Sequence, residues 1–165
     1  MTEDLAVFYL SELGIEASPR LLLDAPTNSF PNTEMVAGKL PIVFYMAGFN
    51  GMGFENYKVL ERLAQEGVLV VSIWSVGRYP GNMSNQKTDM LEQVLDAEYV
   101  LTHFRSDHDI LIDTDKIGVL GMSWGGMSSA VFTARNPEIS VFVSFDGSEN
   151  HYFGMDLQQK TGQLI

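Results

Sequence analysis

Four short, mostly apolar segments follow one another from residue 40 onward, and helical patterns separate them. An apolar run of this length is typical of a strand buried on both faces, as in a parallel sheet. We expect strands at 40–47, 68–74, 117–121 and 139–145, and helices at 54–65, 88–104 and 124–135. Strands that alternate with helices predict an α/β fold: a three-layer α/β/α sandwich with a mostly parallel, doubly wound sheet.

The remaining segments carry weaker patterns. Residues 3–13 have apolar side chains near helical spacing and predict a first helix, which Gly14 ends. Residues 24–39 and 77–86 are rich in Gly, Pro and Asn and predict irregular loops, whereas 105–115 is a polar connection and the tail 151–165 is weakly patterned. No repeat or Gly/Ser-rich linker divides the chain, so we expect one domain over 1–165.

The helix expected at 88–104 has an apolar face of its own. Its members are Leu91, Val94, Leu95, Val100 and Leu101. This spacing predicts that the helix packs those five side chains against the sheet.

Charge and composition limit the partners. Twenty-one Asp and Glu against ten Lys and Arg give a net charge of −11, and the basic residues are scattered, which predicts no nucleic-acid partner. Cysteine is absent, so no disulfide or thiolate metal site is expected. The apolar runs are too short to span a bilayer as helices, and the acidic start lacks the pattern of a signal peptide; we expect a soluble chain, cytoplasmic by default.

A short Gly-Ser-Gly motif lies between the third strand and the last helix. Gly121-Met-Ser123-Trp-Gly125 follows the strand and opens a helix rich in small residues. A serine on such a tight turn stands clear of the sheet, while glycine on either side avoids collision with neighbouring backbone. The pattern predicts Ser123 as a nucleophile and the Trp124 N–H as an oxyanion donor, the alternative being a chance match in a Gly-rich turn.

Two further residues are candidates at the same sheet edge. Phe49 follows the first strand in a Gly-rich turn, and we expect its N–H to be the second oxyanion donor, although an ordinary strand-to-helix turn would also need these glycines. Asp146 ends the fourth strand, where a carboxylate can orient a histidine; an Asp before Gly147 is also a common turn residue.

A serine nucleophile needs a base, and the chain has three histidines. His103 lies in a helix and His108 in the polar connection that enters the third strand from its opposite end, so both are expected to face solvent. His151 follows Asp146 by five residues at the correct edge. His151 is therefore the candidate base.

These residues resemble the α/β-hydrolase superfamily, and within it the branch of dienelactone hydrolase and the platelet-activating-factor acetylhydrolases. The resemblance covers about 40–147 and rests on Pro41-Ile-Val-Phe-Tyr-Met-Ala-Gly-Phe-Asn50, Val76-Gly-Arg-Tyr-Pro-Gly81 and Ile112-Asp-Thr-Asp-Lys-Ile-Gly-Val-Leu-Gly-Met-Ser-Trp-Gly-Gly126. It implies a serine hydrolase acting on a carboxylic ester or related acyl bond of a small molecule, with no cofactor or metal. In this branch the acid follows the strand after the nucleophile helix, where Asp146 stands.

The sequence also departs from that family. Ala47-Gly48 replaces the usual His-Gly before the oxyanion residue, Met122 replaces the usual His before the nucleophile, and no late strand with a catalytic His follows. The resemblance thus implies that the domain over 1–165 is incomplete at both ends and holds the central part of the fold, strands three to six in the order 4-3-5-6. Both outer strands would be unpaired, so we expect the first helix or the tail to cover an edge, or self-association. The alternative function is a catalytically incomplete fragment or binding module without the triad His.

Overall fold

The computed structural model describes residues 1–34, 38–77, 82–84, 86–106 and 112–146. They belong to two compact units, Met1–Val36 and Ala37–Ile165. The first contains α1 (Glu3–Glu12) and the short α2 (Arg20–Leu23). The Thr2 hydroxyl caps α1 by accepting a hydrogen bond from the Leu5 N–H at 3.3 Å, and Gly14 follows the helix with a φ of 65°. The helix expected at 3–13 is confirmed, whereas the single turn of α2 is too short to produce a periodic pattern.

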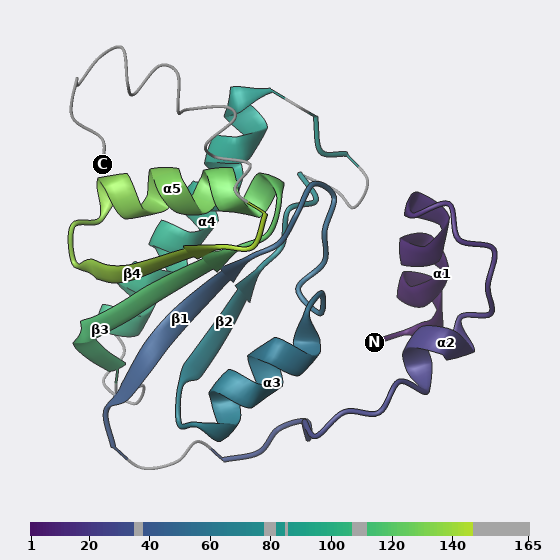
Figure 1. Ribbon diagram of the computed structural model, residues 1–165, viewed down its shortest axis with the longest axis horizontal. Coiled ribbons are helices and arrows are strands. Elements are labelled where there is room, and N and C mark those ends of the chain that lie inside the picture. The colour runs from purple at the N-terminus through teal and green to yellow at the C-terminus, as the bar shows by residue number, and fades with distance from the viewer. Residues whose placement is uncertain (35–37, 78–81, 85, 107–111, 147–165) are drawn as a thin grey trace. The chain divides into compact units, whose positions relative to one another are not determined.

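The described residues of the second unit form a four-stranded parallel sheet with three helices (Figure 1). Its strands are β1 (Leu40–Met46), β2 (Leu69–Ile73), β3 (Ile112–Gly121) and β4 (Ile139–Ser144). Its helices are α3 (Tyr57–Gln65), α4 (Lys87–Ser106) and α5 (Trp124–Arg135). The strand order is β2-β1-β3-β4, which confirms the order implied by the hydrolase resemblance.

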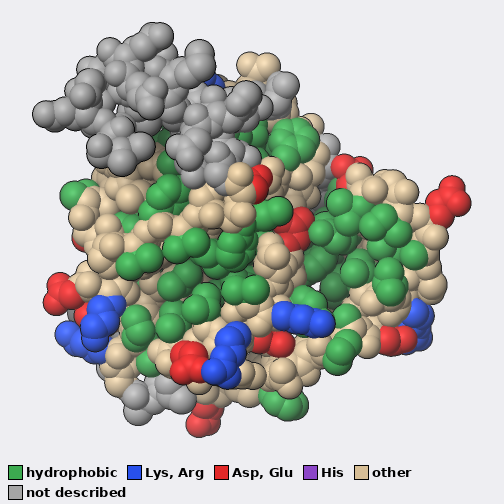
Figure 2. Space-filling model, in the orientation of Figure 1, with side chains coloured by type: hydrophobic (Ala, Val, Ile, Leu, Met, Phe, Trp, Pro, Cys, Tyr) green, Lys and Arg blue, Asp and Glu red, His purple; other side chains and the backbone are tan. Residues whose placement is uncertain are grey.

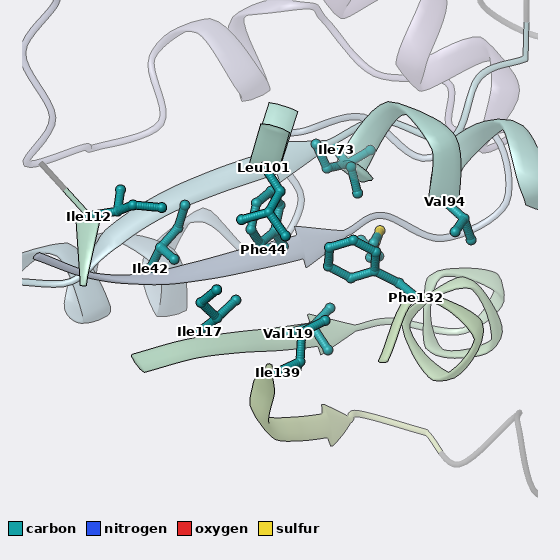
Figure 3. Close-up of a cluster of buried hydrophobic side chains, with 12 residues drawn as sticks. Ile42, Phe44, Ile73, Val94, Leu101, Ile112, Ile117, Val119, Phe132 and Ile139 are labelled. Atoms are coloured by element: carbon teal, nitrogen blue, oxygen red, sulfur yellow. The ribbon is translucent and has the colours of Figure 1, made fainter. Parts of the chain in front are cut away.

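Helices cover both faces of this sheet. On one face α4 and α5 contribute Val94, Leu101 and Phe132 to a cluster with the β1 and β3 side chains, of which Phe44 and Ile117 are fully buried (Figure 3). On the other face Leu60 of α3 packs with side chains from β1 and β3. The three-layer α/β sandwich expected from the sequence is therefore present.

The third strand begins earlier than expected. The prediction of a strand from residue 117 is wrong by five residues, because Ile112 already pairs with Leu40 of β1. The register then shifts, so that Ile42 pairs with Ile117. Between these positions the side chains are polar and partly exposed, and Lys116 pairs with Asp113 at 3.0 Å. Polar residues near the start of a strand have the composition of a loop, which explains the error.

The apolar face predicted for α4 is also partly wrong. Leu95 is 53% exposed and Leu91 36% exposed, whereas the helix buries Met90, Gln93, Val94, Ala97 and Leu101. Met90, Val94, Ala97 and Leu101 follow one another at three- and four-residue steps, and Gln93 lies beside Val94 in the same stripe. One member of the stripe, Gln93, is polar.

β4 is an outer strand that carries exposed apolar side chains. Within the described residues it pairs only with β3, and Val141 and Val143 are 55% and 42% exposed. Figure 2 shows hydrophobic side chains gathered on the face of the molecule over the sheet. Self-association through such an edge stays a prediction, and the tail at 151–165 lies outside the described residues. None of the described helices combines the length and apolar character needed to cross a bilayer.

Glu98 ties α4 to the end of α5. Its carboxylate accepts hydrogen bonds from the Arg135 Nε at 2.7 Å, the Arg135 Nη2 at 2.9 Å and the Asn136 Nδ2 at 3.2 Å. The hydrogen bonds from Arg135 chiefly lower the pKa of Glu98. A carboxylate whose pKa is lower in the folded state stabilises the fold above its ordinary pKa, and that contribution is lost as the pH falls through the folded-state pKa.

Replacing Glu98 by Gln is expected to lower the free energy of unfolding by about 1 kcal/mol near neutral pH. This value lies at the upper end of the range of stabilisation by partly exposed ion pairs, about 0–1 kcal/mol. The difference from the wild type should shrink as the pH falls from the ordinary pKa of a glutamate through the lowered pKa of Glu98 in the folded state, where the wild-type carboxylate also becomes neutral. Urea denaturation across this pH range measures it. Glu66→Gln, in the exposed pair with Arg62, is the control and should change stability by only a few tenths of a kcal/mol. A Glu98→Gln difference that stays constant into acid would contradict the account.

Candidate active site

Ser123 occupies a backbone conformation that an L-residue rarely adopts. Its φ is 53° and its ψ is −121°, and the Gly125 N–H donates to the Met122 carbonyl oxygen at 2.8 Å. These values describe the first central position of a type II′ turn, which normally belongs to glycine. A non-glycine residue in such a conformation costs about 1–3 kcal/mol and persists only where the surrounding structure imposes it. The turn leads directly into α5, so the side chain of Ser123 stands at the carboxyl end of β3.

Glycine is required on both sides of this serine. A Cβ on Gly121 would lie 2.4 Å from the Gly125 carbonyl oxygen, and a Cβ on Gly125 would lie 2.1 Å from the Met46 carbonyl oxygen. Both contacts are with backbone atoms that a side-chain rotation cannot move. The motif therefore has the geometric reason that the sequence suggested: β3, the turn and the end of β1 approach too closely for any side chain.

A second turn lies beside the first. The Gly51 N–H donates to the Gly48 carbonyl oxygen at 2.7 Å, and Asn50 has a φ of 52°. A Cβ placed on Gly48 would lie 3.7 Å from the Ser123 Cβ. The ring of Phe49 meets the ring of Trp124 edge to face, with centroids 5.6 Å apart. The structure thus brings Phe49, Trp124 and Ser123 together.

The backbone N–H groups of Phe49 and Trp124 donate no hydrogen bond to any residue in the part of the chain that the structure describes. Trp124 is the first residue of α5, where an N–H has no partner within the helix. The positive end of the helix dipole lies at the same place. Two free donors beside a serine hydroxyl can bind a developing negative charge on oxygen.

Asp146 lies at the same edge of the sheet as Ser123. Gly121 and Ser144 are partners in the β3–β4 register, and the Phe145 N–H donates to the Gly121 carbonyl oxygen at 2.9 Å. Ser123 and Asp146 each follow the last paired position of their strand by two residues. Parallel strands end at one edge, so the fold brings the two residues to neighbouring positions there, with Asp146 exposed.

The histidines separate into two groups. His151 and His108 lie outside the described residues. His103 is exposed in the last turn of α4, which returns the chain to the amino-terminal edge of the sheet because β3 runs parallel to β2. Ser123 stands at the opposite edge, so His103 is not placed to act as its base.

A small cavity of about 90 Å³ opens where β2 ends and α4 begins. Its lining includes Trp74, Met83 and three carboxylates, Asp89, Glu92 and Asp96. Burial and the neighbouring charge of Glu92 raise the pKa of Asp96, whereas hydrogen bonds from Ser84 lower the pKa of Asp89. Within the described residues no three His, Asp or Glu side chains are grouped as a metal site would require.

Two residues of this region were missed by reasoning from the sequence. Met83 is 7% exposed; its N–H donates to the Asn50 Oδ1 at 3.1 Å, and its side chain packs with Trp124. Gln93 is 2% exposed and bonds to backbone at the ends of β1 and β2. Neither lies in a motif, and the separation of Gln93 from its partners along the chain leaves no local signal.

Comparison with solved structures identifies the fold family. No protein-family model matches the sequence, and no curated protein does. Among solved structures, the chain is similar to a protein assigned as a dienelactone hydrolase from Klebsiella pneumoniae subsp. pneumoniae MGH 78578, with a TM-score of 0.51, 22% identity, and coverage of 65% of this chain and 48% of that chain.

Two other structures give the same result. A ferulic acid esterase from Streptomyces cinnamoneus has a TM-score of 0.53 at 20% identity over 63% of this chain and 35% of that chain. The α/β hydrolase GrgF from Penicillium sp. sh18 has a TM-score of 0.52 at 13% identity over 76% of this chain and 46% of that chain. The chain spans less than half the length of each of these proteins. Their likeness, with the parallel sheet and the turn after β3, shows that the chain has the α/β-hydrolase fold.

Proposed function

We propose that this protein is a serine hydrolase that cleaves a carboxylic ester or a related acyl bond of a small molecule, with Ser123 as its nucleophile. One observation carries the proposal: Ser123 holds a glycine-like conformation at the tip of the turn between β3 and α5. A serine is an unfavourable choice there unless its hydroxyl is needed. The esterase and hydrolase activities named for the similar structures support the same reaction class.

The proposed reaction proceeds through an acyl-enzyme. The Ser123 Oγ attacks the substrate carbonyl carbon while its proton passes to a base, and the carbonyl electron pair moves onto oxygen. The Phe49 and Trp124 N–H groups bind this oxyanion. The carbonyl reforms as the bond to the leaving alcohol breaks, and the alcohol takes the proton from the base. Water then attacks the acyl-Ser123 ester in the same way and releases the acid.

The base in this proposal is His151, oriented by Asp146 at the same sheet edge. Hydrolysis of p-nitrophenyl acetate by the whole protein tests both the reaction and the base. Ser123→Ala should remove the activity, and His151→Ala should lower kcat by about 10³-fold or more. His103→Ala is the matched control and should leave kcat unchanged, because His103 is exposed at the opposite edge. Undiminished activity of His151→Ala would contradict the base assignment, and a wild type no faster than buffer would favour a binding module.

The role of the Phe49 N–H can be tested by removing that group alone. Phe49 is the first central residue of the turn closed by Gly48 and Gly51, a position that accepts proline. Phe49→Pro is expected to lower kcat by about 10²-fold, the usual effect of losing one oxyanion donor, with little change in KM. Phe49→Ala keeps the N–H and removes only the 45% exposed ring, so its kcat should stay near the wild-type value. Equal loss of kcat in both variants would show that the ring, and not the N–H, matters.

A further inference from the structure

We infer that Gln93 is a positioning residue: its side-chain amide fixes the turn that presents the Phe49 N–H to the oxyanion. The inference rests on the proposed function. Gln93 belongs to α4 and is separated by 46 positions from Ala47 and by 20 from Ile73, yet its Nε2 donates to the carbonyl oxygens of both, at 3.1 and 3.2 Å. With 2% of its surface exposed, it is a buried polar residue in the otherwise apolar stripe of α4.

The two carbonyl groups lie at the ends of neighbouring strands. The Ala47 N–H also donates to the Ile73 carbonyl oxygen, at 3.1 Å. Ile73 therefore has a backbone partner without Gln93, whereas among the described residues only the glutamine amide donates to the Ala47 carbonyl. Residues 48–51 form the turn that contains Phe49, and we call it the oxyanion turn. Ala47 immediately precedes this turn, so the bond from Gln93 fixes the position at which the chain enters it.

The same carbonyl group also touches the nucleophile turn. A Cβ on Gly125 would lie 2.5 Å from the Ala47 oxygen, which places that oxygen directly against the segment that follows Ser123 and Trp124. The Ala47 carbonyl is thus packed between the Gln93 amide and the turn after β3. By fixing it, Gln93 sets the position of one oxyanion donor, Phe49, relative to the other, Trp124.

Other hydrogen bonds, which do not involve Gln93, hold the second half of the oxyanion turn. The Ser75 N–H donates to the Gly51 carbonyl oxygen at 3.0 Å, and the Met83 N–H donates to the Asn50 Oδ1 at 3.1 Å. Loss of the Gln93 amide should therefore loosen the entry to the turn while its exit stays attached. Such a change shifts the Phe49 N–H without unfolding the sheet.

The side-chain amide of Gln93 is energetically unfavourable in one respect. The Gln93 Oε1 is buried and has no hydrogen-bond partner within the described residues. A buried carbonyl without a partner is destabilising, so an apolar side chain of the same length would meet the needs of packing alone at least as well. The presence of glutamine favours a role for its two N–H donors.

Gln93→Met tests this role, because it keeps the length of the side chain and removes both N–H donors. Gln93→Asn is the second variant; it keeps the amide, but its side chain is one carbon too short to reach the two carbonyl groups. Amide hydrogen exchange over 47–51 should become about tenfold faster in either variant. The kcat for p-nitrophenyl acetate should fall about 10–100-fold with KM within about twofold of the wild type, because misplacement by about 1 Å can cost that much. Leu101→Val is the control on the same helix and should lower the melting temperature without changing exchange over 47–51 or kcat.

The outcomes separate the two proposals. Unchanged exchange over 47–51 in both Gln93 variants would overturn the positioning role, whatever the activity. Faster exchange with an unchanged kcat would show that Gln93 holds the turn but does not position a catalytic donor, and would overturn the inference as well. A wild type that neither cleaves the ester nor reacts with a fluorophosphonate contradicts the proposed function, and with it the catalytic part of this inference, while the exchange data still decide whether Gln93 holds the turn.

Discussion

Replacing Ser123 by glycine is expected to make the protein more stable by about 1 kcal/mol and to abolish ester hydrolysis. The stabilisation follows from the backbone, because glycine adopts a φ of 53° and a ψ of −121° without the strain that a Cβ causes. The relief of about 1–3 kcal/mol is partly offset, by up to about 1 kcal/mol, since glycine gives the unfolded chain more freedom. The lost activity follows from the lost hydroxyl.

Ser123→Ala is the matched variant for this experiment. It also removes the hydroxyl, so kcat/KM should fall by about 10³-fold or more, yet it keeps the Cβ and therefore the backbone strain. Urea denaturation should place the Ala variant near the wild type and the Gly variant above both. A Gly variant less stable than the Ala variant would show that the turn is not strained at this position.

The second large effect is expected at Gly125. Gly125→Ala should lower the free energy of unfolding by about 3 kcal/mol or more, because the new Cβ would stand 2.1 Å from the Met46 carbonyl oxygen and 2.5 Å from that of Ala47. Relief of these contacts requires β1 and α5 to separate, and both belong to the packed core. Thermal or urea unfolding measures the loss, and failure to recover folded protein is the extreme form of the same result.

Gly118→Ala is the control for Gly125→Ala. Gly118 lies in β3, and the nearest atom to its Cβ would be the Val43 Cγ2 at 3.3 Å, a side-chain atom that can shift by a few tenths of an ångström. We expect a loss below about 1.5 kcal/mol at this position. Similar losses for the two variants would contradict the close approach of the Ser123 turn to the end of β1.

The parts of the fold that could be predicted are those with local signals. The apolar runs at 40–47 and 139–145 correspond to β1 and β4 within a residue, and the helix at 124–135 corresponds to α5. β1 is largely buried and therefore apolar, whereas β4 is apolar although its residues 140–143 are exposed; in both, composition alone reveals the strand. The Gly-Ser-Gly motif was visible for a similar reason, because close backbone contact excludes every residue but glycine.

The parts that could not be predicted depend on contacts between distant segments. Ile112 belongs to a strand only because it pairs with Leu40, and the polar residues after it concealed this. The stripe of α4 was misjudged because Leu95 is apolar and exposed while Gln93 is polar and buried. Gln93 can be buried because two carbonyl groups lie within reach of its amide, a fact that no local pattern records.

The most direct test of the central claim is reaction of the whole protein with a fluorophosphonate, followed by mapping of the adduct by mass spectrometry. An activated serine attacks phosphorus and displaces fluoride, whereas ordinary serines do not react. The account predicts one adduct, on Ser123, and no labelling of Ser123→Ala or of urea-unfolded protein. Folded protein that remains unlabelled, or an adduct on another residue with Ser123 unmodified, would contradict the assignment of Ser123 as the nucleophile.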